Sequence, residues 1–139
     1  MEGLMDANPA LTAVQALLSS VPSVGPHVAR TLIAELPELG QLNGKQIAAL
    51  AGLAPFACDS GTFSGRRRIF GGRPIVRQGL YQSAVVAARW NPQIAPMYER
   101  LKAAGKPSRV ALVACARKLL VILNAMMRDA KPWQPLSGQ

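Results

Sequence analysis

The sequence predicts a single, mainly α-helical domain of five or six helices arranged as a bundle. Half of its 139 residues are apolar but only 5% are aromatic, so Leu, Ile, Val, Ala and Met must form the core, which favours packed helices over a β-sandwich. Apolar residues recur at three- and four-residue spacing along most of the chain, and this is the helical period. A chain of this length buries roughly two-thirds of the surface that it exposes when unfolded, which is enough for one core.

The first half of the chain predicts three helices. Apolar residues within 11–18 form one stripe, and this helix should end near Ser19 or Ser20. The second helix should span residues 26–36, because a proline and then a glycine follow it. The third begins after Asn43, which can cap it while Gln46 reaches back to complete a capping box.

The second half predicts an irregular loop and then three more helices. Residues 55–73 lose the helical period, and their glycines break the segment into turns with room for a short β-ribbon. Pro74 suits a first helical position, and the helix that follows to Trp90 has one apolar face: Val76, Leu80, Ala84 and Ala87. Further helices are expected at 94–104 and at 107–128, where two adjoining apolar stripes predict a nearly buried central helix.

These elements define the expected domain limits. Residues 1–10 should be a flexible N-terminus, 11–130 one domain whose helical second part covers 74–130, and 131–139 a loose tail with two prolines. We expect Trp90 and Trp133 to pack at helix ends, with stacking on nucleic-acid bases as the alternative.

The positive charge is concentrated in the second half of the chain. Residues 1–59 carry two basic and five acidic residues, a net charge of −3, whereas residues 60–139 carry fourteen basic and two acidic residues, a net charge of +12. No acid lies between Asp59 and Glu99, so nothing within that stretch neutralises its arginines. A polyanionic partner is therefore expected. The basic residues of the last two helices could line a nucleic-acid groove or form a solvated face.

The sequence also argues against several other classes of protein. Two cysteines and no Cys/His cluster exclude a disulfide framework and predict no metal site. The N-terminus has no basic region of the kind that opens a signal peptide, and the longest apolar run, residues 119–123, is too short to cross a bilayer. We therefore expect a cytoplasmic protein without a membrane partner.

The segment at about 14–37 resembles the helix-hairpin-helix motif of many DNA-binding and DNA-repair proteins. The hairpin of that motif normally reads Pro-Gly-hydrophobic-Gly; here Pro22, Val24 and Gly25 match it, and Ser23 replaces the first glycine. Such a turn aims backbone N–H groups and a helix N-terminus at a phosphate without reading bases. Ser23, Gly25 and His27 are candidate DNA contacts. The alternatives are an ordinary packing corner and, more often for a lone histidine, a solvated or core-edge His27.

The loop contains a serine followed by clustered arginines. The turn Asp59-Ser60-Gly61 offers an exposed hydroxyl, and arginine forks bind phosphate bidentately and stabilise charge on a phosphorus centre under attack. No histidine or carboxylate pair lies nearby in sequence to activate the serine. The alternative is a plain turn beside a solvated basic face. The arginines are Arg66, Arg67, Arg68, Arg73 and Arg77.

Several motifs in order resemble the C-terminal transposase domain of the IS110/IS116/IS902 family of insertion-sequence recombinases. They are GLAP, DSG, a Gly-Arg-Arg-Arg run, GGR, VRQGLYQSAVVAARWNP and YERLKAAGKPSRVALVACARKLLVILNAMMR. The resemblance covers roughly residues 15–130. It implies a prokaryotic DNA recombinase with a serine nucleophile, matched here by Ser60, with Ser64 as the nearest alternative. The arginines of the loop would then hold the DNA backbone.

The same resemblance implies partners. The family carries an N-terminal RuvC-like domain with four acidic ligands for a divalent metal, expected to be Mg²⁺, and uses a structured guide RNA. A homo-oligomer is expected for the full-length protein. The seven acids of this sequence cannot be assigned to those four ligands, so we expect a fragment, a remnant or a separate domain that has no cofactor of its own and is inactive alone.

Two other functions remain open on the residues. The chain could be a non-catalytic DNA- or RNA-binding helical module in which Ser60 is only a turn residue. It could also be a helical assembly domain whose basic face meets acidic protein surfaces.

Overall fold

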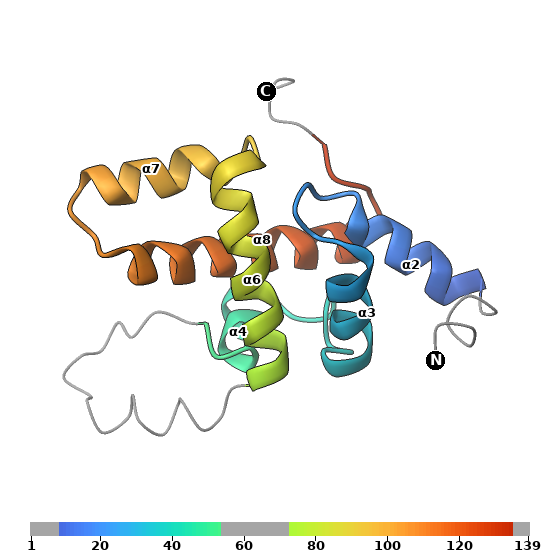
Figure 1. Cartoon of the computed structure of the whole chain (residues 1–139). Helices are drawn as coiled ribbons and strands as arrows, with labels where there is room; N and C mark the ends of the chain where they lie inside the picture. Colours follow the sequence, from blue (N-terminus) through green and yellow to red (C-terminus); the bar gives the residue numbers. More distant parts are fainter. Residues whose placement is uncertain (1–8, 54–72, 135–139) are drawn as a thin grey trace, which may run out of the picture.

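The computed structural model describes residues 9–53 and 73–134 (Figure 1). Over these residues the chain forms six α-helices and no strand, which confirms the mainly α fold, and the predicted helix ends lie within two residues of the observed ones. The loop at 55–73, except Arg73, lies outside the described residues, as does the β-ribbon considered there. The helices are α2 (Pro9–Ser19), α3 (Pro26–Glu35), α4 (Gly44–Leu50), α6 (Pro74–Trp90), α7 (Ala95–Ala103) and α8 (Ser108–Asp129).

Helix α8 is the central element of the fold. It packs against α2, α4, α6 and α7, and Figure 1 shows it running through the middle of the molecule. The predicted apolar stripes meet the core, where Cys115, Leu119, Leu120 and Leu123 are fully buried, but both ends of the helix are exposed, so it is less buried than predicted. By length and composition alone α8 is apolar enough to span a membrane, but 44% of its most apolar stretch is buried inside the fold. Packing in the core therefore accounts for its apolar character.

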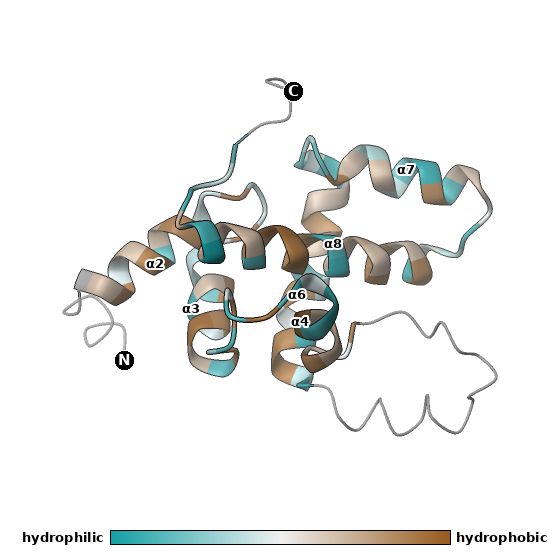
Figure 2. Cartoon of the chain, turned by 180° about the vertical axis from the view of Figure 1, so that it is seen from behind, coloured by the Kyte–Doolittle hydropathy of each residue, from teal (hydrophilic) through white to brown (hydrophobic). Residues whose placement is uncertain are grey.

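Helix α6 crosses α8 and makes the most extensive helix contact of the fold. Its buried face is the predicted one, since Val76, Leu80, Ala84 and Ala87 have no exposed surface. Small alanine side chains in such a face let two helix axes approach closely. Helix α7, by contrast, has no buried residue and shows more polar colour than α2 in Figure 2.

The connection between α3 and α4 is fastened to α8 by Asn124, a buried polar residue. Its Oδ1 accepts a hydrogen bond from the Gly40 N–H (2.6 Å), and its Nδ2 donates to the Leu42 carbonyl (2.8 Å). Gly40 has a positive φ of 88°, and a Cβ there would lie 2.9 Å from the Met127 Cβ. The backbone therefore lies directly against α8, where only glycine fits. The predicted capping box of α4 follows this turn, with Asn43 and Gln46 bonded to each other's backbone.

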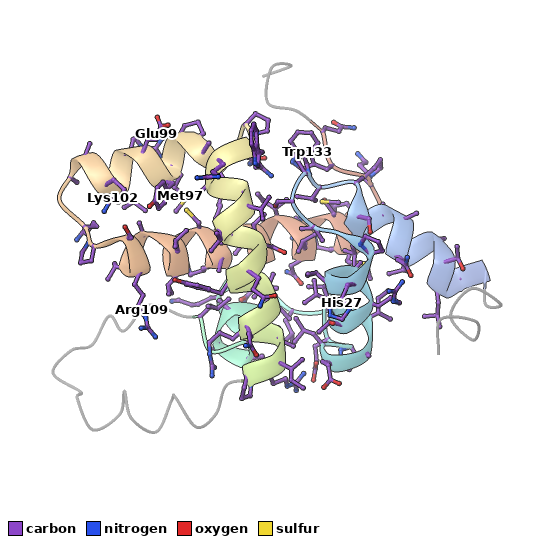
Figure 3. All side chains as sticks on the ribbon, in the orientation of Figure 1. His27, Met97, Glu99, Lys102, Arg109 and Trp133 are labelled. Atoms are coloured by element: carbon purple, nitrogen blue, oxygen red, sulfur yellow. The ribbon has the colours of Figure 1, made fainter. Side chains whose placement is uncertain are left out.

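The chain that follows α8 turns back toward the core. Ala130 has the left-handed conformation that ends the helix, and the chain then turns back so that the backbone N–H of Trp133 donates to the Ser20 Oγ (2.9 Å). Trp133 packs against the core, as expected of it (Figure 3). Of the predicted loose tail at 131–139, the structure describes residues 131–134, where the Trp133 side chain is partly buried. Residues 1–8 and 135–139 lie outside the described residues.

Candidate nucleic-acid interface

The turn between α2 and α3 has the geometry of a tight hairpin. Val21 and Val24 are buried, at 1% and 3% exposure, and the Val24 N–H donates to the Val21 carbonyl (3.0 Å). Ser23 between them has a φ of 92°, a region that favours glycine. The replacement of the first motif glycine by serine therefore falls on the one residue of the hairpin that needs a left-handed backbone.

The N-terminus of α3 faces outward from this hairpin. Its N-cap, Gly25, makes no side-chain cap hydrogen bond, and Pro26 occupies the first helical turn. A Cβ on Gly25 would meet no atom within 4 Å, and its φ of −83° suits any residue. The fold thus does not require glycine at position 25. A nucleic-acid backbone that approaches the helix would benefit from the open space that glycine leaves.

His27 follows on the first turn of α3. Its side chain is exposed (Figure 3), so it takes the solvated position that the sequence analysis favoured, on the same outward end of α3 as Gly25.

Asn91 connects the hairpin to the corner between α6 and α7. This buried residue caps the corner between α6 and α7, where its Oδ1 accepts from the backbone N–H groups of Gln93 (2.8 Å) and Ile94 (3.1 Å). Its Nδ2 donates to the Pro22 carbonyl at 2.9 Å. One amide therefore joins the hairpin to a corner 69 residues away. Sequence reasoning missed this role, because Asn-Pro after a helix indicates only where the helix stops.

Arg73 lies in an ion pair, which contradicts the expectation that its charge is uncompensated. Its two terminal nitrogens donate to both carboxylate oxygens of Glu38 (2.7 and 2.9 Å), and one also donates to the Glu35 carbonyl (3.1 Å). These hydrogen bonds lower the pKa of Glu38 to about 2 and raise that of Arg73. The expectation failed because it considered only acids near Arg73 in sequence, and Glu38 is 35 residues away. Any DNA contact by Arg73 would compete with this pair.

The predicted nucleophile and most of the predicted arginines, Ser60, Arg66, Arg67 and Arg68, lie outside the described residues. Their roles stay predictions. The chain on either side of them is held by the fold: Leu53 is buried, and Arg73 is tied to the end of α3. Arg77 lies one turn after Arg73 on α6 and is partly buried.

Three basic residues gather at the corner between α7 and α8. Lys102, Lys106 and Arg109 are all exposed, and the Lys102 Nζ donates to the Ser108 Oγ (3.0 Å). Figure 3 labels Lys102 and Arg109 on the two helices of this corner. We call these three residues the basic corner. Its side chains can reach phosphates, because all three are exposed and no ion pair engages them among the described residues.

The described residues bring together no catalytic cluster. No three His, Cys, Asp or Glu side chains in 9–53 and 73–134 lie close enough to hold a metal ion. Cys115 is fully buried in α8, and burial raises the pKa of its thiol. A buried thiol is a poor nucleophile, so Cys115 is a core residue.

Trp90 departs from the expectation that it packs at a helix end. It lies at the last residue of α6 and is 73% exposed. Beside it is an open depression of about 390 Å³ between α6 and α7, lined by Ala88, Arg89, Trp90, Tyr98 and Glu99. The expectation was wrong because the depression between α6 and α7 is open, so these two helices leave most of the indole exposed.

Comparison with known proteins gives a consistent result. Residues 15–99 match the family described as Transposase IS116/IS110/IS902. A 43.6 kDa protein of insertion element IS110 from Streptomyces coelicolor is 30% identical over 93% of this chain and 31% of its own length. A 42 kDa protein of insertion element IS900 from Mycobacterium paratuberculosis is 38% identical over 65% of this chain and 23% of its own length.

A further relative is the pilin gene-inverting protein of Moraxella bovis. It is 27% identical over 94% of this chain and 42% of its own length. The chain thus spans between about a quarter and two-fifths of the length of these relatives.

Proposed function

The chain belongs to the IS116/IS110/IS902 transposase family, and on this premise we propose that it binds DNA and serves in strand cleavage and exchange. The names of its relatives, two insertion-element proteins and a pilin gene-inverting protein, support DNA rearrangement as the setting. The net charge of +9 supports a polyanionic partner. The structural observation that carries the proposal is the N-terminus of α3, where no side chain caps the helix at Gly25 and no atom lies within 4 Å of a Cβ placed there.

We propose two regions of phosphate contact on the described surface. At the hairpin, the first-turn N–H groups of α3 and the exposed His27 would bind one phosphate next to Ser23 and Gly25. At the basic corner, Lys102, Lys106 and Arg109 would bind the backbone without reading bases. Further contacts are proposed for the arginines of the loop and its end: Arg66, Arg67, Arg68, Arg73 and Arg77.

Ser60 is the proposed nucleophile. Its Oγ would attack a backbone phosphorus, form a new P–O bond and release one deoxyribose oxygen, which takes up the proton that the serine loses. The link stores the energy of the broken phosphodiester, so a second sugar hydroxyl can reverse the step on a different strand. Arginines beside the phosphate would stabilise the charge that develops on its oxygens.

Other parts of this reaction are proposed to come from partners. A RuvC-like domain with acidic residues would supply the divalent metal, expected to be Mg²⁺, since the described residues of this chain hold no group that fits one. A structured guide RNA would choose the target, and the full-length protein would act as a homo-oligomer. The greater length of the relatives leaves room for such a domain.

Strand transfer by a Ser60→Ala variant, with the chain joined to a RuvC-like domain, tests the nucleophile. We expect no covalent protein–DNA product and no recombination, with duplex affinity unchanged, because the substitution removes one oxygen and no charge. Ser64→Ala is the matched control, being the nearest other serine, and should remain active. Recombination by Ser60→Ala would reject the catalytic role and leave a non-catalytic nucleic-acid-binding module.

A further inference from the structure

The depression beside Trp90 has the chemical make-up of a base-binding pocket. It combines two aromatic side chains, Trp90 and Tyr98, with a cation, Arg89, and an acceptor, Glu99. Within the described residues, neither Arg89 nor Glu99 has an ion-pair partner. The indole of Trp90 is 73% exposed, and Val86, one turn earlier on α6, is 45% exposed. A large flat apolar surface and unpaired polar groups are therefore available in one place.

This pocket adjoins the hairpin at which a phosphate is proposed to bind. Trp90 ends α6, and the next residue, Asn91, donates directly to the Pro22 carbonyl of the hairpin (2.9 Å). Figure 1 shows the end of α6 beside the turn between α2 and α3. A single strand bound at the N-terminus of α3 could therefore run along the hairpin toward the indole.

Charge decides which kind of partner fits. Residues 77–103, which exclude the paired Arg73, carry four cations and one acid, Glu99, so a phosphate backbone is attracted to this region. A second copy of the chain would bring the same net charge of +9 and be repelled. Exposed aromatic side chains interspersed with arginine are the usual platform for single-stranded nucleic acid.

We propose that this pocket holds one unstacked base of a single strand, with the base lying on the face of Trp90. The proposal rests on the DNA-binding function proposed above and adds a site to it. Arg89 would bind the neighbouring phosphate. The Glu99 carboxylate would accept hydrogen bonds from the base edge, which favours guanine because guanine presents two adjacent N–H donors, N1–H and N2–H. Stacking itself is indifferent to base identity.

Tryptophan fluorescence of the 139-residue chain provides a direct test, because only two tryptophans are present. Trp133→Phe leaves Trp90 as the single reporter. We titrate this variant with a short oligothymidylate that carries one central guanine, and separately with the all-thymine strand. The expected result is quenching by both strands, with tighter binding of the guanine strand.

The affinity of Trp90→Ala for the same strands, each carrying a fluorescent label, is then measured by anisotropy. Loss of one stacked base should weaken binding roughly 5- to 150-fold, and Trp90→Phe should restore part of it. Glu99→Gln should keep stacking and lose the guanine preference. Ile75→Ala, an exposed apolar residue at the other end of α6 (57% exposed), is the matched control and should bind as the unaltered chain does.

Three outcomes would overturn the proposal. Trp90→Ala could bind single strands normally while circular dichroism shows it folded, or Ile75→Ala could weaken binding equally. Sedimentation could instead show a concentration-dependent dimer that Trp90→Ala abolishes, which would make the pocket an interface between copies. Filter retention of duplex DNA at low salt is measured in parallel. If the unaltered chain retains duplex but Trp90→Ala binds single strands normally, only the pocket proposal is rejected. If the unaltered chain retains no duplex, the proposed DNA binding is rejected as well.

Discussion

Ser23 has two unfavourable features in the folded state, its backbone conformation and its buried hydroxyl. Its φ of 92° belongs to the region where a side chain is strained. Its Oγ is buried without a hydrogen-bond partner among the described residues, and such a group loses its hydration without compensation. Both costs fall on the hairpin, beside the N-terminus of α3, where the proposed phosphate site lies.

Ser23→Gly should therefore stabilise the protein, by about 1 kcal/mol, because glycine adopts this backbone freely and removes the buried hydroxyl. Chemical denaturation measures the free energy of unfolding. Ser23→Ala separates the two causes, since it removes the hydroxyl but keeps the strained φ. Equal stability of the glycine and alanine variants would show that the backbone is not strained.

The Glu38–Arg73 pair should make the stability of the protein depend on pH. Hydrogen bonds from Arg73 lower the pKa of Glu38 from 4.5 to about 2. A carboxyl with a depressed folded-state pKa stabilises fully above its unfolded value and loses this contribution as pH falls toward the folded one. The thermal midpoint should thus fall between pH 4.5 and about 2 more steeply in the unaltered chain than in Glu38→Gln.

Glu35→Gln is the control for this measurement. Glu35 lies at the same end of α3, but Arg73 binds its carbonyl and not its carboxylate. This variant should keep the acid dependence of the unaltered chain. The ion pair would be excluded as the cause if Glu38→Gln showed the same acid profile as Glu35→Gln.

At the scale of the element, four helices begin at signals carried by their first residues or the residue just before them. Asn43 and Gln46 begin α4 through a capping box, and prolines stand in the first turns of α3, α6 and α7. Such signals act over three or four residues, and for this reason the helix ends were predictable. The importance of α8 comes instead from its contacts, because four helices pack against it.

Leu120→Ala should cost about 2–5 kcal/mol of unfolding free energy, since it leaves a cavity where α8 meets its neighbours. Leu120 has no exposed surface. Val110→Ala is the matched control on the same helix, because Val110 is 51% exposed, and it should change stability by less than about 0.5 kcal/mol. Urea titration of both variants compares them; similar midpoints would mean that α8 is not the centre of the core.

At the scale of the whole molecule, the uneven charge governs binding. The basic corner presents cations on two helices, and binding to phosphates releases counterions, so affinity should fall as salt rises. An assembly domain that meets acidic proteins would share the charge but would retain no DNA on a filter at low salt.

Arg109→Ala should lower the slope of log affinity for duplex DNA against log salt concentration by about 1, because one phosphate contact is lost. Arg128→Ala is its counterpart at the other end of α8, where Arg128 is already paired with Asp129 (3.0 Å). This control should leave the slope nearly unchanged. Filter binding over a salt series measures both, and equal slopes for all three proteins would remove the basic corner from the interface.

The sequence by itself determined the helices, their buried faces and the family, because these depend on spacing and on motifs within short stretches of chain. It also located the hairpin and the serine that replaces its first glycine, whereas the left-handed backbone of Ser23 was seen only in the structure. The roles of Ser60 and the loop arginines remain predictions.

Only the tertiary structure decided which polar residues meet. Arg73 binds Glu38, Asn91 binds Pro22 and Asn124 binds Gly40 across separations of 35, 69 and 84 residues. The exposure of Trp90 was decided in the same way, by how α6 and α7 pack around it. No local pattern encodes such pairs, because they form only when the packing of the core brings distant segments together.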